Sequence, residues 1–315
     1  MPFLGHTRFS IVSPSSPSWR LTRSTEMSTT QYTSALFSPE RMETRCKIFF
    51  DFSLPAIDKA ARQHQLFHVV SYSEELPERY KSHLFDAAST YDWLRLDLQT
   101  PTNREDQALE EIAKRELRPG TIFATYRLDD DDLLGQSYFD SLGRYLKQPF
   151  VGSFISFSSG IQAIFDGSSF VDPRFEHRPK IAIGLARICE YRQDLNLNQP
   201  PRSSHTKSDL VAPVVLDGRS LQFLHTLHPR QDSLLTGKQG SLANHLRNHY
   251  KLPDALGDQS LETYFPNVDF TKGSSDTRLR LSFGDKENNP SSIAGWAEQF
   301  AREVKLLRGR INWFR

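Results

Sequence analysis

The chain has 315 residues, enough to bury a sizeable core in one α/β domain, with or without a smaller appendage. Its 39 Lys and Arg residues nearly balance 38 Asp and Glu residues, so the net charge of +1 provides no broad positive field for nucleic acid. An anionic ligand must therefore be bound by local groups. The only two cysteines, Cys46 and Cys189, cannot form a disulfide framework, which favours a reducing compartment.

The N-terminal segment lacks the charged flank and apolar run of a signal peptide. No uninterrupted apolar stretch reaches the length needed to span a bilayer. We therefore expect a cytoplasmic protein. A basic C-terminal tail would allow contact with the inner face of the membrane, and its charged residues are Arg302, Lys305, Arg308, Arg310 and Arg315.

Apolar runs of strand type alternate with helical patterns through the first half of the chain. Ser38 followed by Pro39 is typical of a helix start, with serine as the N-cap and proline at the first helical position. In chain order we expect a strand at 7–12, a helix at 38–52, a buried strand at 66–72, a helix at 77–85, a strand at 92–98, a polar helix at 103–117 and a strand at 121–126. This alternation predicts an α/β fold with a mostly parallel sheet.

The second half of the chain is less regular. Its expected elements are an apolar helix at 133–146, a strand at 150–157 with its partner at 161–165, an apolar element at 180–187, polar loops at 196–208 and 267–292, and an amphipathic helix at 293–307. We predict a main domain over residues 1–250. Residues 251–315 would form a C-terminal extension with a loop and the amphipathic helix.

Four consecutive carboxylates, Asp129 to Asp132, follow the strand expected at 121–126. Open parallel sheets bind ligands at the carboxyl ends of their strands. Crowded carboxylates repel one another, and Mn²⁺ or Mg²⁺ relieves that repulsion while leaving positions free for phosphate oxygens. Such a cation stabilises negative charge as a sugar–phosphate bond breaks. The alternative is a solvated acidic loop, or one that caps the next helix.

The acidic run resembles a known signature. With Arg127 two residues before Asp129 and an apolar helix expected afterwards, the segment is similar to the Arg-x-Asp-x-Asp-Asp signature of glycosyltransferases with the GT-A fold. Asp129 and Asp131 would be its DxD pair, and Asp132 its last acid.

Two further phrases extend this resemblance. Gly5–Ser10, Val69–Pro77 and the acidic run occur in the order seen in a bacterial family described as putative rhamnosyltransferases, over roughly residues 7–240. The resemblance implies a GT-A-like (Rossmann-like) nucleotide-sugar-binding domain, a nucleotide-diphosphate sugar as donor, a divalent metal, and a glycan or glycolipid acceptor. Rhamnose is the sugar that it favours.

The resemblance also assigns roles within the acidic run. Arg127 would orient the loop or contact phosphate, Asp129 and Asp131 would organise the metal and the ribose, and Asp132 would hold the loop or the donor sugar. Ser71 ends the second strand, where GT-A proteins usually meet the nucleotide, although a turn-forming serine explains it equally well.

Arg8 and Arg45 are the basic residues that we place near the donor, because a guanidinium suits phosphate oxygens. Arg8 lies in the first expected strand. For Arg45 the favoured interpretation is a surface ion pair, since Arg41 and Glu43 lie close to it on the same helix.

His225 and His228 have an odd spacing, which directs them to opposite faces of a strand. They cannot form a two-histidine metal clamp in that arrangement. His228, next to the turn at Pro229, is the one that we predict to complete the metal site, because many GT-A enzymes add a C-terminal histidine to the DxD pair. A structural histidine is the favoured alternative for either.

If transfer inverts the anomeric centre, a carboxylate must take the acceptor proton from the face opposite the leaving group. Asp232 and Glu176 are the candidates for this catalytic base. Both lie in expected polar turns, and both would otherwise be solvated loop acids.

Two other functions fit an acidic run. Haloacid-dehalogenase-like phosphatases also place Asp-x-Asp after an apolar strand, but they usually need Thr or Val where this chain has Leu133. A Ca²⁺-dependent carbohydrate-binding module could use four aspartates, but its all-β pattern disagrees with the alternation of strands and helices. A metal-dependent glycosyltransferase is therefore the preferred interpretation.

Overall fold

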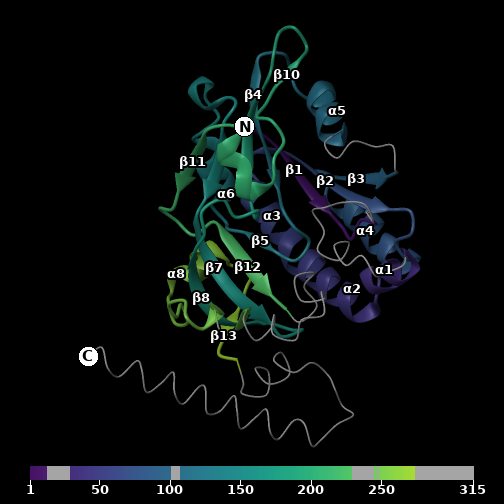
Figure 1. Ribbon diagram of the computed structural model, residues 1–315, viewed down its shortest axis with the longest axis vertical. Helices are drawn as coiled ribbons and strands as arrows, with labels where there is room; N and C mark the ends of the chain where they lie inside the picture. The colour runs from purple at the N-terminus through teal and green to yellow at the C-terminus, as the bar shows by residue number, and fades with distance from the viewer. Residues whose placement is uncertain (13–28, 101–106, 229–244, 247, 274–315) are drawn as a thin grey trace, which may run out of the picture.

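Two β-sheets with helices packed against them form the fold (Figure 1). The computed structural model describes residues 1–12, 29–100, 107–228, 245–246 and 248–273. The helix expected at 293–307 and the candidate base Asp232 lie outside these residues. Within the described residues, no helix is both long and apolar enough to cross a membrane.

The larger sheet, sheet A, has eight strands in the described part of the chain, in the order β11-β6-β9-β4-β1-β2-β3 with β10 paired to β9. They are β1 (Pro2–Arg8), β2 (Gln65–Ser73), β3 (Leu94–Gln99), β4 (Thr121–Arg127), β6 (Phe154–Phe157), β9 (Ala186–Tyr191), β10 (Leu197–Asn198) and β11 (Val214–Asp217). Strands β3, β2, β1 and β4 run parallel, whereas β9 is antiparallel to β4 and β6. The predicted α/β fold with a mostly parallel core is confirmed, and β9 makes the sheet mixed.

The smaller sheet, sheet B, lies below sheet A in Figure 1 and has five strands among the described residues, in the order β13-β8-β7-β12-β5. They are β5 (Leu133–Leu134), β7 (Ser159–Phe165), β8 (Phe170–His177), β12 (Phe223–Leu227) and β13 (Phe270–Thr271). Strand β5 leaves the acidic run at once and pairs with β12, so that run connects the two sheets.

Helices cover both faces of sheet A. The helical elements are α1 (Thr29–Leu36), α2 (Pro39–Cys46), η2 (Lys47–Ser53), α3 (Leu54–Ala61), α4 (Glu78–Thr90), α5 (Gln107–Glu116), α6 (Tyr138–Gly143), η3 (Gln148–Phe150), η4 (His205–Leu210) and α8 (Ser260–Tyr264). Phe3 of β1 packs in the cluster formed with α2, η2 and α3, while its neighbour Leu4 packs with α5. This alternation follows from the two-residue repeat of a strand, and it buries β1 on both faces.

The helix predicted from Ser38 is confirmed as α2, with Ser38 as the N-cap and Pro39 in its first turn. The helical path continues through η2, a π-helical segment, into α3. Two strand predictions are wrong. The strand predicted at 7–12 is β1, which begins earlier and ends before Ser10, where φ is +48°. The predicted pairing of 150–157 with 161–165 does not occur, because β6 and β7 belong to different sheets.

The helix predicted at 133–146 is also largely wrong. Leu133 and Leu134 form β5, and a helix begins only at Tyr138. The apolar element predicted at 180–187 becomes a strand only from Ala186. Short apolar runs suit a buried strand or a buried helix equally well, so their pairing partners decide between the two.

Residues 251–273 pack on sheet B. Strand β13 pairs with β8, and Asp254 forms an isolated antiparallel bridge with Arg174 of β8. The boundary at residue 250 stays a prediction, since residues 274–315 lie outside the described part of the chain.

Gly5 occupies a crowded position in the middle of β1. A Cβ atom there would overlap the ring of His68 and the phenol of Tyr126. These groups are fixed, since the Tyr126 hydroxyl donates to His68 Nδ1 at 2.8 Å and His68 Nε2 donates to Thr7 Oγ1 at 2.9 Å. Burial lowers the pKa of His68 to about 3, so its ring stays neutral.

Replacing Gly5 with Ala is therefore expected to lower the free energy of unfolding by about 1–3 kcal/mol or more, as in other overpacked cores. Urea unfolding followed by tryptophan fluorescence measures this change. An unchanged urea midpoint would show that β1 and β2 can move apart without cost.

Candidate functional site

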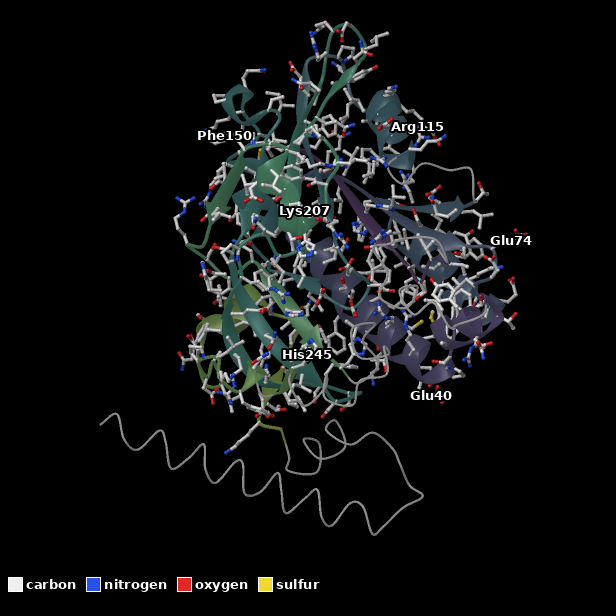
Figure 2. The ribbon with its side chains drawn as sticks, viewed as in Figure 1. Glu40, Glu74, Arg115, Phe150, Lys207 and His245 are labelled. Atoms are coloured by element: carbon white, nitrogen blue, oxygen red, sulfur yellow. The ribbon has the colours of Figure 1, made fainter. Side chains whose placement is uncertain are left out.

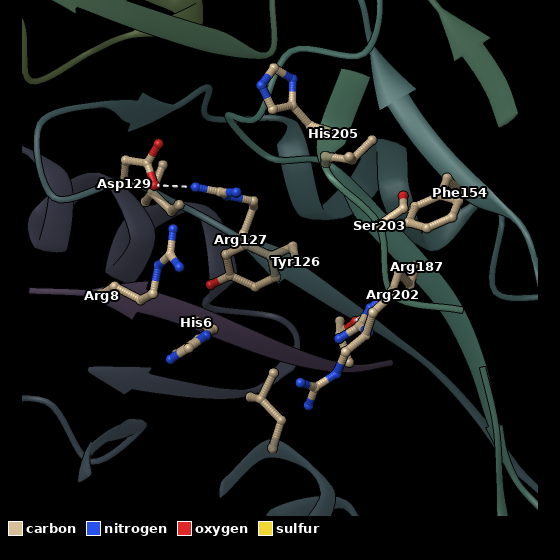
Figure 3. A pocket seen from close by; sticks show the side chains of 14 residues that line it. His6, Arg8, Tyr126, Arg127, Asp129, Phe154, Arg187, Arg202, Ser203 and His205 are labelled. Atoms are coloured by element: carbon tan, nitrogen blue, oxygen red, sulfur yellow. Dashed lines mark hydrogen bonds and ion pairs between the residues drawn. The ribbon is translucent and has the colours of Figure 1, made fainter. Parts of the chain in front are cut away.

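A cleft of about 140 Å³ opens at the carboxyl ends of β1 and β4 (Figure 3). Arg8 and Arg127 end these two strands, and Arg187 reaches the cleft from β9. Of the described residues that line the cleft, Asp129 is the one with a carboxylate. The remaining basic residues of the lining are His6, Arg202 and His205.

The register of sheet A brings these side chains together. Side chains two residues apart on a strand share a face, so His6 and Arg8 of β1 point to the same side. The parallel pairing of β1 with β4 sets His6 opposite Arg127. On antiparallel β9, Arg187 pairs with Thr125 and donates from Nε to its hydroxyl oxygen at 3.0 Å. Distant parts of the chain thus place several guanidinium groups around one small volume.

Asp129 faces this cleft. Its carboxylate accepts a hydrogen bond from Arg127 at 2.7 Å, drawn as a dashed line in Figure 3, and the two side chains are 39% and 37% exposed. Burial works to raise the pKa of Asp129, but the charge of Arg127 and its hydrogen bond outweigh that effect and hold the pKa below its usual value. Asp129 is therefore ionised at neutral pH.

Asp130 and Asp131 lie behind the cleft, against helix α2. Arg45 pairs with Asp130 and lies 3.0 Å from Asp131, and all three side chains are buried. The surface ion pair favoured for Arg45 is therefore wrong. Helix α2 turns Arg45 inward with Arg41, so its guanidinium neutralises the acidic run from within.

Strand β12 holds the other side of the acidic run. Asp132 accepts the backbone N–H of Thr226 at 2.9 Å, and His228 Nε2 lies 3.1 Å from Asp131 Oδ2. Burial and then the charges of Asp131 and Asp129 raise the pKa of Asp132 well above its usual value. For Asp131, burial opposes ionisation, but Arg45 and His228 hold its pKa below the usual range. The run is thus fixed between α2 and β12.

The four predicted metal ligands do not gather at one point. No three His, Cys, Asp or Glu side chains among the described residues are arranged to hold a metal ion. Asp131 and His228 lie side by side, and Asp129 faces the cleft. A carboxylate beside an imidazole suits a hard cation that takes further oxygens from its ligand. Asp132 does not fit this role, because its carboxyl group accepts a hydrogen bond from the backbone of β12 and its raised pKa favours the neutral form.

Ser71 supports the cleft from below its surface. It is fully buried, and its hydroxyl donates to Asp97 Oδ2 at 2.7 Å. It accepts from His6 Nε2 at 2.8 Å, and His6 lines the cleft. Ser71 therefore orients His6 through a chain of side chains at the ends of β1, β2 and β3.

Four basic residues of the cleft lining were not predicted from the sequence as site residues: His6, Arg187, Arg202 and His205. The segment that holds Arg202 and His205 reads as a polar loop, and only its basic residues could have drawn attention to it. In the structure His205 Nδ1 donates to the carbonyl oxygen of Lys180 at 2.7 Å. Its position over the cleft is visible in Figure 3.

Glu176 lies in strand β8, so the polar turn expected there is wrong. Its side chain is buried on sheet B and its Oε2 accepts from His225 Nδ1 at 2.9 Å. His225 and His228 contact different acids, Glu176 and Asp131, as their odd spacing predicts. The other candidate base, Asp232, lies outside the described residues.

Comparison with known families identifies the class of the protein. A family model described as "Putative rhamnosyl transferase" matches residues 3–238, which include the cleft and the acidic run. The protein is thus an enzyme of the glycosyltransferase class. It belongs to this putative rhamnosyl transferase family, which confirms the resemblance seen in the sequence. No curated protein sequence matches the chain.

Several solved structures resemble the chain weakly. A putative glucose-1-phosphate thymidylyltransferase from Bacillus anthracis has 10% identity over 70% of this chain and 88% of its own, with a TM-score of 0.32. The inositol-1-phosphate CTP transferase from T. maritima has the same identity and coverage, with a TM-score of 0.33. Residues 1–349 of TarS from S. aureus show 9% identity, 89% and 77% coverage and a TM-score of 0.29. The assignment depends on the family match, since such scores add nothing to it.

Proposed function

We propose that this enzyme moves a sugar from a nucleoside-diphosphate donor to a hydroxyl group of a saccharide or glycoconjugate, and that the basic cleft binds the diphosphate. The observation that carries the proposal is the lining of the cleft, where four arginines surround one carboxylate. The whole chain has a net charge of only +1, so this concentration of positive charge is local. Family membership favours rhamnose as the sugar.

Arginines suit this task because a planar guanidinium can donate two parallel hydrogen bonds to phosphate oxygens. In the proposed complex the diphosphate contacts Arg8 and Arg127, at the ends of adjacent parallel strands, and Arg187 of β9. Asp129 holds Arg127 in place and, being ionised and open to the cleft, can accept from a ribose hydroxyl. Ser71 does not contact the donor in this proposal; it orients His6, which lines the cleft, through their hydrogen bond.

A divalent cation belongs to this proposal, with Asp131 and His228 as its protein ligands and Asp129 on the cleft side. The distance of 3.1 Å between His228 Nε2 and Asp131 Oδ2 supports these two residues as ligands. The buried Nδ1 of His228 supports them too, because it has no hydrogen-bond partner among the described residues. Bound Mn²⁺ or Mg²⁺ would neutralise charge on the departing diphosphate. Asp132, predicted as a ligand, would instead keep β12 attached to the acidic run.

A thermal-shift screen with nucleoside diphosphates and nucleotide sugars, with and without Mn²⁺, tests both parts. A ligand at about 100 times its Kd stabilises the folded state by about 2.7 kcal/mol, which raises Tm by several degrees. We expect at least one nucleoside diphosphate to do so, and more strongly with Mn²⁺. Asp131→Asn should remove the Mn²⁺-dependent part, whereas Asp86→Asn on the exposed side of α4 should not.

The two parts fail separately. If no nucleoside diphosphate stabilises the protein in either condition, the donor proposal is wrong. An equal shift with and without Mn²⁺, retained after chelation by EDTA, would contradict the metal ligands and leave the diphosphate site standing.

A further inference from the structure

Sheet B carries a chain of buried polar side chains outside the arginine-lined cleft. Glu176 Oε2 lies 2.9 Å from His225 Nδ1, and the amide nitrogen of Gln162 lies 3.3 Å from Glu176 Oε1 and 3.0 Å from the same Nδ1. We assign the proton to Nδ1 because its nearer partner is the carboxylate. The Gln162 amide also contacts His249 at 2.9 Å, and His249 Nε2 donates to the carbonyl oxygen of Asp172 at 3.0 Å. Residues 245–246 and 248–250 lie against this face, as the position of His245 in Figure 2 shows. Buried polar networks of this kind are costly unless each member has a partner, and they hold their side chains in fixed positions.

The pair formed by Glu176 and His225 has the arrangement of a base and its orienting acid. A carboxylate at Nδ1 fixes the tautomer in which Nε2 is free to accept a proton, and it stabilises the imidazolium that results. The side chain of His225 is 18% exposed, whereas that of Glu176 is 9% exposed. The imidazole is thus the member of the pair that a substrate can reach.

Strand β12 places this pair close to the proposed donor site. His225 is flanked by Thr226, whose N–H contacts Asp132, and it is three residues before His228, which contacts Asp131. On the other side, the guanidinium of Arg178 lies 3.5 Å from Glu176. The charge of Arg178 also acts on His205, which lines the cleft. Arg178 is therefore near both Glu176 and His205, although neither Glu176 nor His225 is among the described residues that line the cleft.

His205 is the competing imidazole, and its surroundings are unsuitable for a base. Burial lowers the pKa of His205, and the charges of Arg127 and Arg178 lower it further. An imidazole that accepts a proton must then carry a positive charge, which these guanidinium groups oppose. His225 differs from His205 in its neighbour, because the carboxylate of Glu176 lies 2.9 Å from its Nδ1.

We infer that His225 is the general base that deprotonates the acceptor hydroxyl, and that Glu176 is its positioning residue. This inference rests on the proposed function. The acceptor oxygen bonds to the anomeric carbon while its proton passes to His225 Nε2. The bond from the anomeric carbon to the phosphate oxygen breaks, and its electron pair leaves with the nucleoside diphosphate. Inversion of the anomeric centre would require His225 to act on the face of the sugar opposite the leaving group.

The test uses the full chain and the nucleotide sugar that stabilises it most in the thermal-shift screen. Release of nucleoside diphosphate is measured in water alone and with a panel of methyl glycosides as acceptors. His225→Asn is expected to lower kcat by about 10²–10⁴-fold, with the Kd for the nucleoside diphosphate changed by less than about twofold. Added imidazole should restore release in His225→Ala. His177→Asn, on the neighbouring exposed residue of β8, should behave as the wild type.

Glu176→Gln distinguishes a positioning role from a structural one. Removing the carboxylate withdraws stabilisation from the imidazolium, so the acidic limb of the pH profile of kcat/KM should move to lower pH. Gln162, Arg178 and His249 also face the pair and remain in this variant. If instead His225→Asn keeps release within about threefold of the wild type while Glu176→Gln loses it, Glu176 is the base and the inference is wrong.

A second measurement decides the matter if the wild type releases no nucleoside diphosphate. In ¹⁵N NMR of histidine-labelled protein, His225 should carry its proton on Nδ1 in the wild type and should lose this tautomer preference in Glu176→Gln. A proton on Nε2 would overturn the inference. Absence of donor binding in the wild type, by contrast, refutes the proposed function itself.

Discussion

Replacing Arg45 with Met is expected to lower the free energy of unfolding by about 3–5 kcal/mol, the usual cost of leaving a buried charge without its partner. The side chain of Arg45 is 6% exposed, and those of Asp130 and Asp131 are 2% and 11% exposed. Methionine keeps most of the volume and removes the charge. Two carboxylates would then remain in a buried site without the charge of Arg45, with His228 beside Asp131 and the charge of Arg41 nearby.

Urea unfolding followed by circular dichroism measures this loss. Arg115→Met is the matched control, since Arg115 pairs with Glu116 on the exposed side of α5 and such a pair contributes about 0–1 kcal/mol. Adding Asp131→Asn to Arg45→Met should recover part of the stability, because it removes one of the two carboxylates that have lost the charge of Arg45. A cost below about 1 kcal/mol for Arg45→Met would mean that water reaches the acidic run and solvates it.

The double replacement of Arg127 and Arg187 by Gln is expected to weaken nucleoside-diphosphate binding by at least about 100-fold. A hydrogen bond to a charged group contributes about 1.5–3 kcal/mol, and each guanidinium supplies at least one such bond in the proposed complex. Gln keeps a donor but loses the charge and the fork geometry. Both side chains line the cleft from different strands, so the backbone of sheet A should be unaffected.

Isothermal titration calorimetry of the thermal-shift hit measures the change in Kd. Arg144→Gln, an exposed arginine outside the cleft, should bind as tightly as the wild type. Wild-type affinity should also fall with added salt, and this dependence should be weaker in the double variant. If the double variant binds within about threefold of the wild type, the diphosphate lies elsewhere.

Most local features of the chain could be predicted from the sequence alone. The buried strand at 66–72, the helix that begins after Ser38, and the acidic run at the end of β4 all depend on neighbouring residues: apolar runs, capping residues and turns. The opposite facing of His225 and His228 follows from the same short-range geometry. A short stretch of sequence is therefore enough to predict these features.

The pairing of strands could not be read in this way. Strand β7 was expected to pair with β6, but it pairs with β8 and β12 in the other sheet. Leu133 and Leu134 were predicted to begin a helix, but they pair with β12 and form a strand. A short apolar run gains its burial from whichever surface it meets, and that surface belongs to distant residues.

The resemblance to the rhamnosyl transferase family and the position of the acidic run at the carboxyl end of a strand could be predicted from the chain alone. The contacts of the individual acids depend on the folded chain: Asp129 faces the cleft, Asp130 and Asp131 face Arg45, and Asp132 is bound to β12. Folding also brings Glu176 to His225 across 49 residues. Charged side chains act through space over a few ångströms, so their partners are set by packing.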